Sequence, residues 1–165
     1  MPASPTDLFA YLDALNIAHN TYEHPATFTV EEGRHLKSTM LGGHSKNLFM
    51  KDKDGVIVLI SAWADSQLKL NQLHKLIGTR RLSFASADLM QDLLGIVPGS
   101  VTPFALMNDV DCRVRFIADA DLMAFETVNF HPLVNTATTA ISSADLRRFA
   151  DVTGHGLTMI DFSVL

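Results

Sequence analysis

The sequence predicts an α+β domain in which helices flank a mixed, largely antiparallel sheet. Helix-capping signals alternate with short runs of β-branched and aromatic residues along the 165-residue chain. Those runs stand too close together for regular strand-helix-strand crossovers, which need a dozen or more residues each. No repeat or Pro/Gly/Ser-rich linker interrupts the sequence, and 47% of its residues are hydrophobic. We therefore expect one domain that spans residues 1–165.

Each expected helix begins at a residue whose side chain can cap it. Ser4 and Asp7 have the spacing of a capping box, with Pro5 in the first turn, and Thr29 and Glu32 repeat that spacing. Three later helices are expected over Gln67–Ile77, Ser86–Gly95 and Ser142–Gly154.

Nine runs have the composition of β-strands. They are Ile17–Glu23, Asn47–Lys51, Val56–Ser61, Arg81–Ala85, Phe104–Met107, Cys112–Ala118, Ala124–Asn129, Thr136–Ile141 and Leu157–Phe162. The second and third runs should form a hairpin, because Asp54-Gly55 between them is a strong tight-turn signal. The only cysteine, Cys112, opens an alternating run, so we interpret it as a small core residue.

Charge is unevenly distributed along the chain. The net charge is −5, but between Arg34 and Arg81 there are nine basic and three acidic residues, against four basic and fifteen acidic residues elsewhere. A basic face could meet phosphates, although a scatter of solvated charges explains the counts equally well. Since no run of 18 apolar residues and no signal-peptide pattern occurs, we expect a soluble, cytoplasmic protein without membrane contact.

Motifs for phosphate loops, dinucleotide binding, nucleophile elbows and metal-binding helices are absent from the sequence. Only His19 and His24 among the seven histidines lie near each other, and no cysteine accompanies them, which disfavours a metal site.

Three segments instead concentrate small and polar residues. In residues 42–50 two glycines precede Lys46 and Asn47, in residues 95–104 two prolines and two glycines form a tight loop, and residues 129–140 contain His131. The loop could direct N–H groups at a carbonyl oxygen, and the glycines could let the backbone approach a ligand. The ordinary alternatives are a solvated lysine, a plain turn and a structural histidine.

Together with residues 24–32 and 81–86, these segments resemble the YbaK/ProX family of aminoacyl-tRNA editing deacylases, specifically its free-standing alanyl-tRNA(Pro) deacylase branch. The resemblance covers nearly the whole chain, and the family's G-x-x-x-P loop stands here as Gly99–Pro103. It implies a single α+β editing domain over residues 1–165, a cytoplasmic location, no metal and no organic cofactor. The implied partner is the acceptor end of mischarged tRNA(Pro) rather than DNA, and a prolyl-tRNA synthetase partner stays open.

The resemblance also implies roles for particular residues. The catalytic candidates are Lys46, Gly99, Ser100 and His131. The substrate-binding candidates are Asn47, Phe28, Val30, Val101, Thr102 and Pro103, with His131 as a further pocket wall. The candidates for tRNA contacts are Lys51, Arg80 and Arg81.

The expected activity is hydrolysis of Ala-tRNA(Pro), with release of alanine and free tRNA. Lys46 would place the ester through a phosphate or ribose hydroxyl, and N–H groups near Gly99 and Ser100 would stabilise the oxyanion. This expectation requires Lys46 and the Gly99–Pro103 loop to face each other across a cavity sized for a methyl group. Two alternatives stay open: an editing deacylase for cysteine or serine, and a non-catalytic module that binds tRNA or a synthetase.

Overall fold

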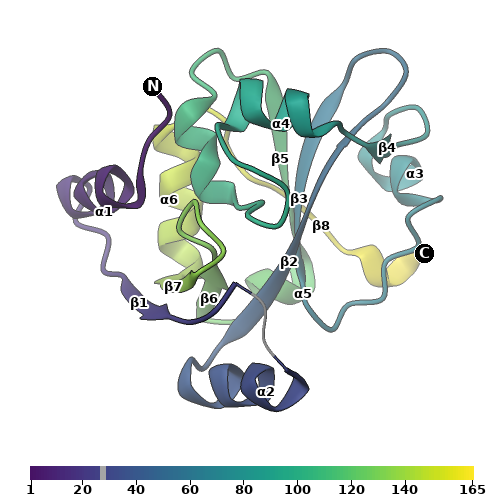
Figure 1. Ribbon diagram of the computed structural model, residues 1–165. Coiled ribbons are helices and arrows are strands. Elements are labelled where there is room, and N and C mark those ends of the chain that lie inside the picture. Colours follow the sequence, from purple (N-terminus) through teal and green to yellow (C-terminus); the bar gives the residue numbers. More distant parts are fainter. Residues whose placement is uncertain (27–28) are drawn as a thin grey trace.

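A mixed sheet organises the chain in the computed structural model, which describes residues 1–26 and 29–165 (Figure 1). Its strands are β1 (Asn20–Glu23), β2 (Gly43–Lys51), β3 (Ile57–Trp63), β4 (Ser83–Phe84), β5 (Val114–Asp119), β6 (Thr127–Phe130), β7 (Ala137–Ser142) and β8 (Thr158–Ile160). The strand order is β1-β7-β6-β2-β3-β5-β8, and β4 pairs with the end of β2. Three pairs of strands are parallel: β2 with β6, β3 with β5, and β5 with β8. The remaining pairs are antiparallel. The predicted α+β class with a mixed sheet is confirmed.

Residues 1–26 and 29–165 contain six α-helices and two short 3-10 helices. They are α1 (Pro5–Ala14), α2 (Val30–Thr39), α3 (Leu73–Ile77), α4 (Ala87–Leu94), α5 (Ala120–Met123), α6 (Ser143–Val152) and the 3-10 helices Pro103–Asn108 and Phe162–Val164. Both predicted capping boxes are present, at Ser4 and at Thr29. None of the helices in the described ranges is long and apolar enough to cross a membrane.

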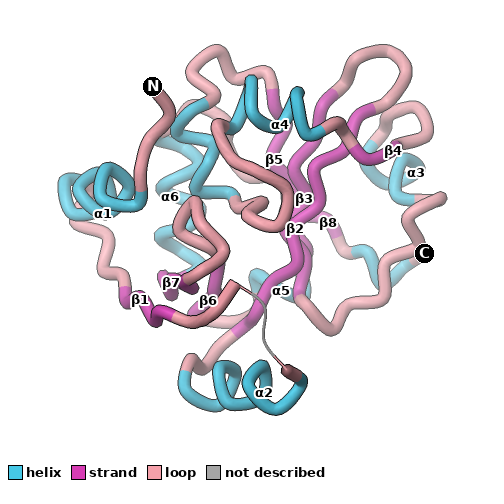
Figure 2. The backbone as a smooth tube through the Cα atoms, viewed as in Figure 1, coloured by secondary structure: helices cyan, strands magenta, loops and turns pink. Residues whose placement is uncertain are grey.

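Two hydrophobic clusters pack against the sheet, and β2 contributes to both. Phe49 joins the larger cluster with residues of α1, α4 and α6, whereas Met50 joins the smaller cluster with residues of α3. In Figure 2, α1 and α6 lie to the left of β2 and β3, and α3 lies to their right. Because side chains alternate along a strand, Ser45 and Asn47 belong to the side of Phe49, and Lys46 belongs to the side of Met50.

Several predicted elements are wrong or displaced. The strand predicted at Phe104–Met107 is a 3-10 helix, because Pro103 fits its first turn and the Thr102 hydroxyl accepts from the Phe104 N–H. The helix predicted over Gln67–Ile77 is reduced to α3. Its expected first turn is instead an irregular segment, in which the Ser66 hydroxyl donates to Asp119 at 2.7 Å.

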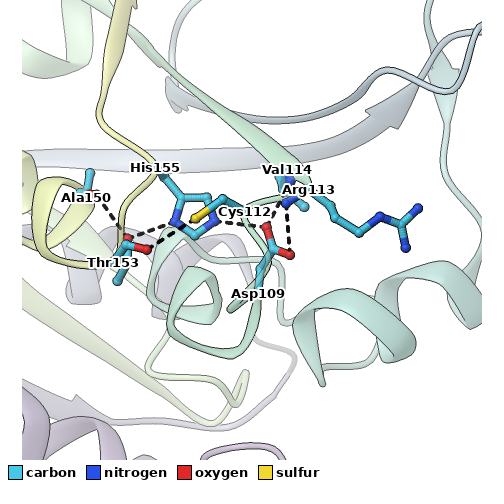
Figure 3. A network of polar contacts seen from close by, with 7 residues as sticks. All are labelled: Asp109, Cys112, Arg113, Val114, Ala150, Thr153 and His155. Atoms are coloured by element: carbon cyan, nitrogen blue, oxygen red, sulfur yellow. Dashed lines mark hydrogen bonds and ion pairs between the residues drawn. The ribbon is translucent and has the colours of Figure 1, made fainter.

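Cys112 is exposed and has a left-handed φ of 52°, so its interpretation as a core residue is wrong. The chain turns here because the buried Asp109 carboxylate accepts from the N–H groups of Arg113 and Val114, and β5 begins only at Val114. Figure 3 shows that Asp109 also contacts His155, with 2.9 Å between Oδ2 and Nε2. This pair, both of whose side chains are buried, joins the chain after α6 to the start of β5.

Candidate active site

A cavity of about 180 Å³ lies where the first residues of β2 meet the end of β6, beneath α2. The helix α2 contributes Gly33, Leu36 and Lys37 to its lining, and β2 contributes His44, Ser45 and Asn47. The rest of the lining is Ala64, which follows β3, Asn129 and Phe130 of β6, His131, and Thr138 of β7. Two of the segments that carry the family resemblance, residues 42–50 and 129–140, meet around it, and His24 of a third segment contacts Thr138 in its wall. The cavity combines apolar walls with several hydrogen-bonding side chains, as small-molecule sites in proteins commonly do.

Side chains on one face of β2 and β3 form a chain of hydrogen bonds along the cavity wall. The hydroxyl of Ser61, which is fully buried, donates to Asn47 Oδ1 at 2.6 Å. Asn47 Nδ2 donates to Ser45 Oγ at 3.1 Å, and the Ser45 hydroxyl donates to the main-chain carbonyl of Asn129 at 2.7 Å. These bonds fix the Asn47 amide and hold β2 against β6, so this part of the wall is preorganised before any ligand arrives.

His131 presents one unpaired ring nitrogen to the cavity. Its Nδ1 lies 2.9 Å from the Ala137 carbonyl, which can only accept, so Nδ1 carries the proton and donates. Burial lowers the pKa of His131 below its ordinary value of 6.5, and the neighbouring His24 lowers it further, against the opposing effect of the Ala137 bond. His131 is therefore neutral near pH 7, and Nε2, which has no partner within residues 1–26 and 29–165, can accept a proton or hydrogen bond.

His24 supports the same wall from the end of β1. Its Nδ1 lies 2.8 Å from the Pro25 carbonyl and its Nε2 lies 2.8 Å from Thr138 Oγ1, while its ring centroid is 6.1 Å from that of His131. His24 thereby fixes the hydroxyl of a residue that lines the cavity.

Lys46 lies on the opposite face of β2 from Ser45 and Asn47, and it does not line the cavity. Its ammonium donates to the main-chain carbonyl of Ser66. Ser66 is held in turn by Asp119, a buried carboxylate that also accepts from the Trp63 N–H. The lysine is thus half-buried and fixed at the side of the strand rather than aimed into the cavity.

The Gly99–Pro103 loop does not line the cavity either. Val97 to Ser100 form a tight turn closed by the Ser100 N–H donating to the Val97 carbonyl at 3.1 Å, with Pro98 second and Gly99 third at a φ of +93°. That arrangement is a type II turn, which requires glycine at its third position. The Ser100 N–H is consequently committed to the turn, and the expected convergence of its N–H on a substrate oxygen is not seen.

The loop instead supports the segment that follows His131. A Cβ at Gly99 would lie 3.3 Å from Nδ2 of Asn135, between β6 and β7. Ser100, Thr102 and Pro103 are buried, and Val101 is half-buried. The expectation that Lys46 and this loop face each other across the cavity is therefore not met, because the Lys46 ammonium is bonded to the Ser66 carbonyl and neither Lys46 nor any residue of the loop lines the cavity.

The two glycines at the start of β2, Gly42 just before it and Gly43 as its first residue, serve packing rather than ligand access. A Cβ at Gly42, whose φ is +99°, would lie 2.4 Å from the Thr127 carbonyl oxygen, and one at Gly43 would lie 2.7 Å from the ring of Phe125. The close approach therefore lets β2 start against β6, the pairing that creates the cavity.

The remaining predicted contacts lie outside the cavity. Val30 begins α2 and is 74% exposed, so it is not a pocket wall in this structure, because Thr29 caps the helix and leaves its first residue in solvent. Phe28 falls outside the described residues. Lys51, Arg80 and Arg81 are exposed near the far end of the β2–β3 hairpin, where Arg80 Nε is 3.2 Å from Asp54 Oδ2.

Sequence reasoning missed several cavity residues. Ser45, Asn129 and Thr138 stand inside the motif segments but were not singled out, because the position of each on a strand face depends on register. In the described part of the chain, no group of three or more His, Cys, Asp or Glu side chains is placed to hold a metal ion.

Known proteins are similar to this chain in sequence and in fold. Residues 24–149 match the model of the aminoacyl-tRNA editing domain. The prolyl-tRNA editing protein ProX of Acetoanaerobium sticklandii is 33% identical over 93% of this chain and 94% of its own. The multifunctional Ser/Thr-tRNA deacylase ProXp-y of Escherichia coli K12 is 29% identical, over 87% of this chain and 86% of its own.

A crystal structure described as a candidate trans-editing enzyme for prolyl tRNA synthetase has the same fold. The TM-score is 0.68 at 19% sequence identity, and the match covers 98% of each chain. The family match spans most of the chain and includes every cavity residue. This protein therefore belongs to the aminoacyl-tRNA editing domain family, in its prolyl-tRNA editing group.

Proposed function

We propose that the protein hydrolyses the ester of Ala-tRNA(Pro), releasing alanine and free tRNA. The observation that carries this proposal is the small cavity whose wall offers the neutral His131, the fixed amide of Asn47 and the buried amide of Asn129. A volume of about 180 Å³ can hold a small aminoacyl group such as alanyl or seryl.

The reaction needs a positioned water more than a strong nucleophile, because an aminoacyl ester is already activated. His131 Nε2 is the group best placed to orient the water, whose oxygen attacks the ester carbonyl while the ribose oxygen departs and gains a proton. General-base assistance of this kind contributes about 10²- to 10⁴-fold. The vicinal ribose hydroxyl of the substrate is a second candidate for directing the water.

Lys46 would act at the entrance rather than in the cavity. Its bond to the neutral Ser66 carbonyl is exchangeable, and we expect the ammonium to leave it for the terminal phosphate of the tRNA, which is the stronger partner. The loop at Gly99–Pro103 would contribute indirectly, by supporting the chain that carries His131. Lys51, Arg80 and Arg81 stay candidates for the acceptor stem, with a prolyl-tRNA synthetase as a further candidate partner.

The other side of α2 is unfavourable for phosphates. A second hollow of about 300 Å³ shares Leu36 with the cavity and is lined by Glu23, Glu31 and Glu32. Because these negatively charged carboxylates repel a polyanion, we expect the tRNA end to enter from the side of Lys37 and Lys46.

Serine is the leading alternative substrate. The E. coli relative is named for Ser/Thr-tRNA deacylation, and the hydroxyl and amide groups of this cavity could accept a seryl hydroxyl. A missing or added small group changes binding by only about 1–3 kcal/mol, whereas a clash with the proline ring excludes that amino acid more strongly. Cysteine differs from serine by one atom and stays in the same class.

A panel of charged tRNAs tests the proposal. Purified protein is incubated with Ala-, Ser-, Cys- and Pro-tRNA(Pro), and loss of the ester is followed over time. We expect fastest hydrolysis of Ala-tRNA(Pro) and none of Pro-tRNA(Pro). Faster release of serine or cysteine would reassign the substrate, and tRNA binding without any hydrolysis would favour a non-catalytic module.

A further inference from the structure

Asn129 is a buried polar residue in the cavity wall with one half of its amide unused. It lies on β6, is 2% exposed and lines the cavity beside His131. Its Nδ2 donates to the main-chain carbonyls of Leu41 and Gly43, each at 3.2 Å. Its Oδ1 has no hydrogen-bond partner in the described part of the protein.

The orientation of this amide is fixed by its neighbours. Both atoms around Nδ2 are carbonyl oxygens, which can only accept, so rotating the amide would place Oδ1 against two acceptors. The carbonyl end is therefore held as an acceptor inside the wall. A buried acceptor without a protein partner is destabilising, and in proteins a water, an ion or a ligand commonly completes the bond.

A second open acceptor lies two residues along the chain. His131 Nε2 is an acceptor because Nδ1 carries the proton, and it has no partner among the described residues. Residues two apart on an extended segment share a face. The cavity wall thus offers two neutral acceptors, and neither is used by the protein. If Nε2 holds the attacking water, Oδ1 is left for a donor on the substrate, and the α-ammonium of an aminoacyl ester is a charged N–H donor close to the ester carbonyl.

We propose that Asn129 positions the α-ammonium group of the aminoacyl ester by accepting one of its hydrogen bonds at Oδ1. This inference rests on the proposed function and adds a determinant of substrate choice to it. Asn129 would make the enzyme prefer esters that carry a free amino group, and it would orient the ester carbonyl relative to His131.

The test combines variants of Asn129 with two substrates. One is Ala-tRNA(Pro), and the other is the propionyl ester of the same tRNA. The propionyl group is an alanyl group without the α-amino group. The ratio of kcat/KM for the two esters reports the interaction with the amino group. In Asn129→Leu we expect the ratio of kcat/KM for the alanyl ester to kcat/KM for the propionyl ester to fall roughly 10- to 100-fold, as loss of a hydrogen bond to a charged group predicts.

Two further variants separate positioning from a structural effect. Asn129→Asp keeps the acceptor at Oδ1 but loses the bonds to the Leu41 and Gly43 carbonyls, so the protein should be less stable while its folded fraction retains the preference for the amino ester. Asn108→Leu removes another asparagine, whose Oδ1 and Nδ2 both have protein partners and which lies outside the cavity. It should leave the ratio unchanged.

Each outcome decides a separate question. If Asn129→Leu slows both esters equally, Asn129 is structural and this inference is overturned while the proposed function stands. If wild-type protein hydrolyses neither ester, the proposed function itself fails, and the inference fails with it.

Discussion

Two buried polar networks in this molecule differ in whether their atoms are all used. Around Asp109 and His155, the carboxylate accepts from two main-chain N–H groups and from the imidazole, and the other ring nitrogen lies 2.9 Å from Thr153 Oγ1 (Figure 3). Around Asn129 and His131, each side chain keeps one acceptor open. A closed network stabilises the fold, whereas an open one at a cavity is built to be completed by a ligand.

The largest expected effect separates the two networks at their histidines. His131→Ala should reduce kcat/KM for Ala-tRNA(Pro) by about 10²- to 10⁴-fold, because it removes the group that orients the water. Single-turnover deacylation measures this, and thermal unfolding should show little change. Activity close to wild type would remove His131 from the chemistry.

His155→Ala should act on stability instead. The variant leaves the buried Asp109 carboxylate without its imidazole partner, and leaving a buried charge unpaired costs about 3–5 kcal/mol of unfolding free energy. Urea unfolding measures the loss. The fraction of protein that remains folded should hydrolyse substrate at the wild-type rate, and a specific loss of turnover would contradict the division between the networks.

Lys46→Ala should lower kcat/KM by roughly 10- to 100-fold, the value of one charge-assisted hydrogen bond to a phosphate. The matched control is Lys53→Ala, since Lys53 is an exposed cation in the turn between β2 and β3, at the other end of the hairpin from the cavity. Equal activity in both variants would mean that Lys46 serves only to hold the Ser66 segment.

The smallest expected effect is in the pH dependence. Because burial lowers the pKa of His131, its neutral form should persist below pH 6.5, and the acid limb of the kcat/KM profile should lie below that value. The lowered pKa of His131 also makes the stability of the native state depend on pH. Below pH 6.5 the unfolded chain binds a proton that the native state resists, so the native state loses stability as pH falls. His131→Gln should remove both contributions, and an acid limb above pH 6.5 would contradict the assignment.

Local signals predicted much of this fold. The capping boxes at Ser4 and Thr29 and the turn at Asp54-Gly55 depend on residues only a few positions apart, and each was placed correctly. The strand predicted at Phe104–Met107 and the interpretation of Cys112 as a core residue were wrong, because a proline turn and distant partners override the β propensity of those runs.

The site was only partly predictable for the same reason. His131 and Asn47 were identified and do line the cavity. Lys46 was expected beside them, yet its side chain lies on the other face of β2, where the ammonium donates to the Ser66 carbonyl, and it does not line the cavity. Asn129 became visible only when the pairing of β2 with β6 placed its amide beside the Leu41 and Gly43 carbonyls.

The central claim is that the open network receives the aminoacyl group. Its most direct test is NMR titration with a non-hydrolysable alanyl-adenosine amide, following the side-chain signals of Asn129, His131 and His155. Binding should shift the Asn129 and His131 signals strongly and leave His155 in place. Saturable binding that leaves both Asn129 and His131 unshifted would contradict the claim.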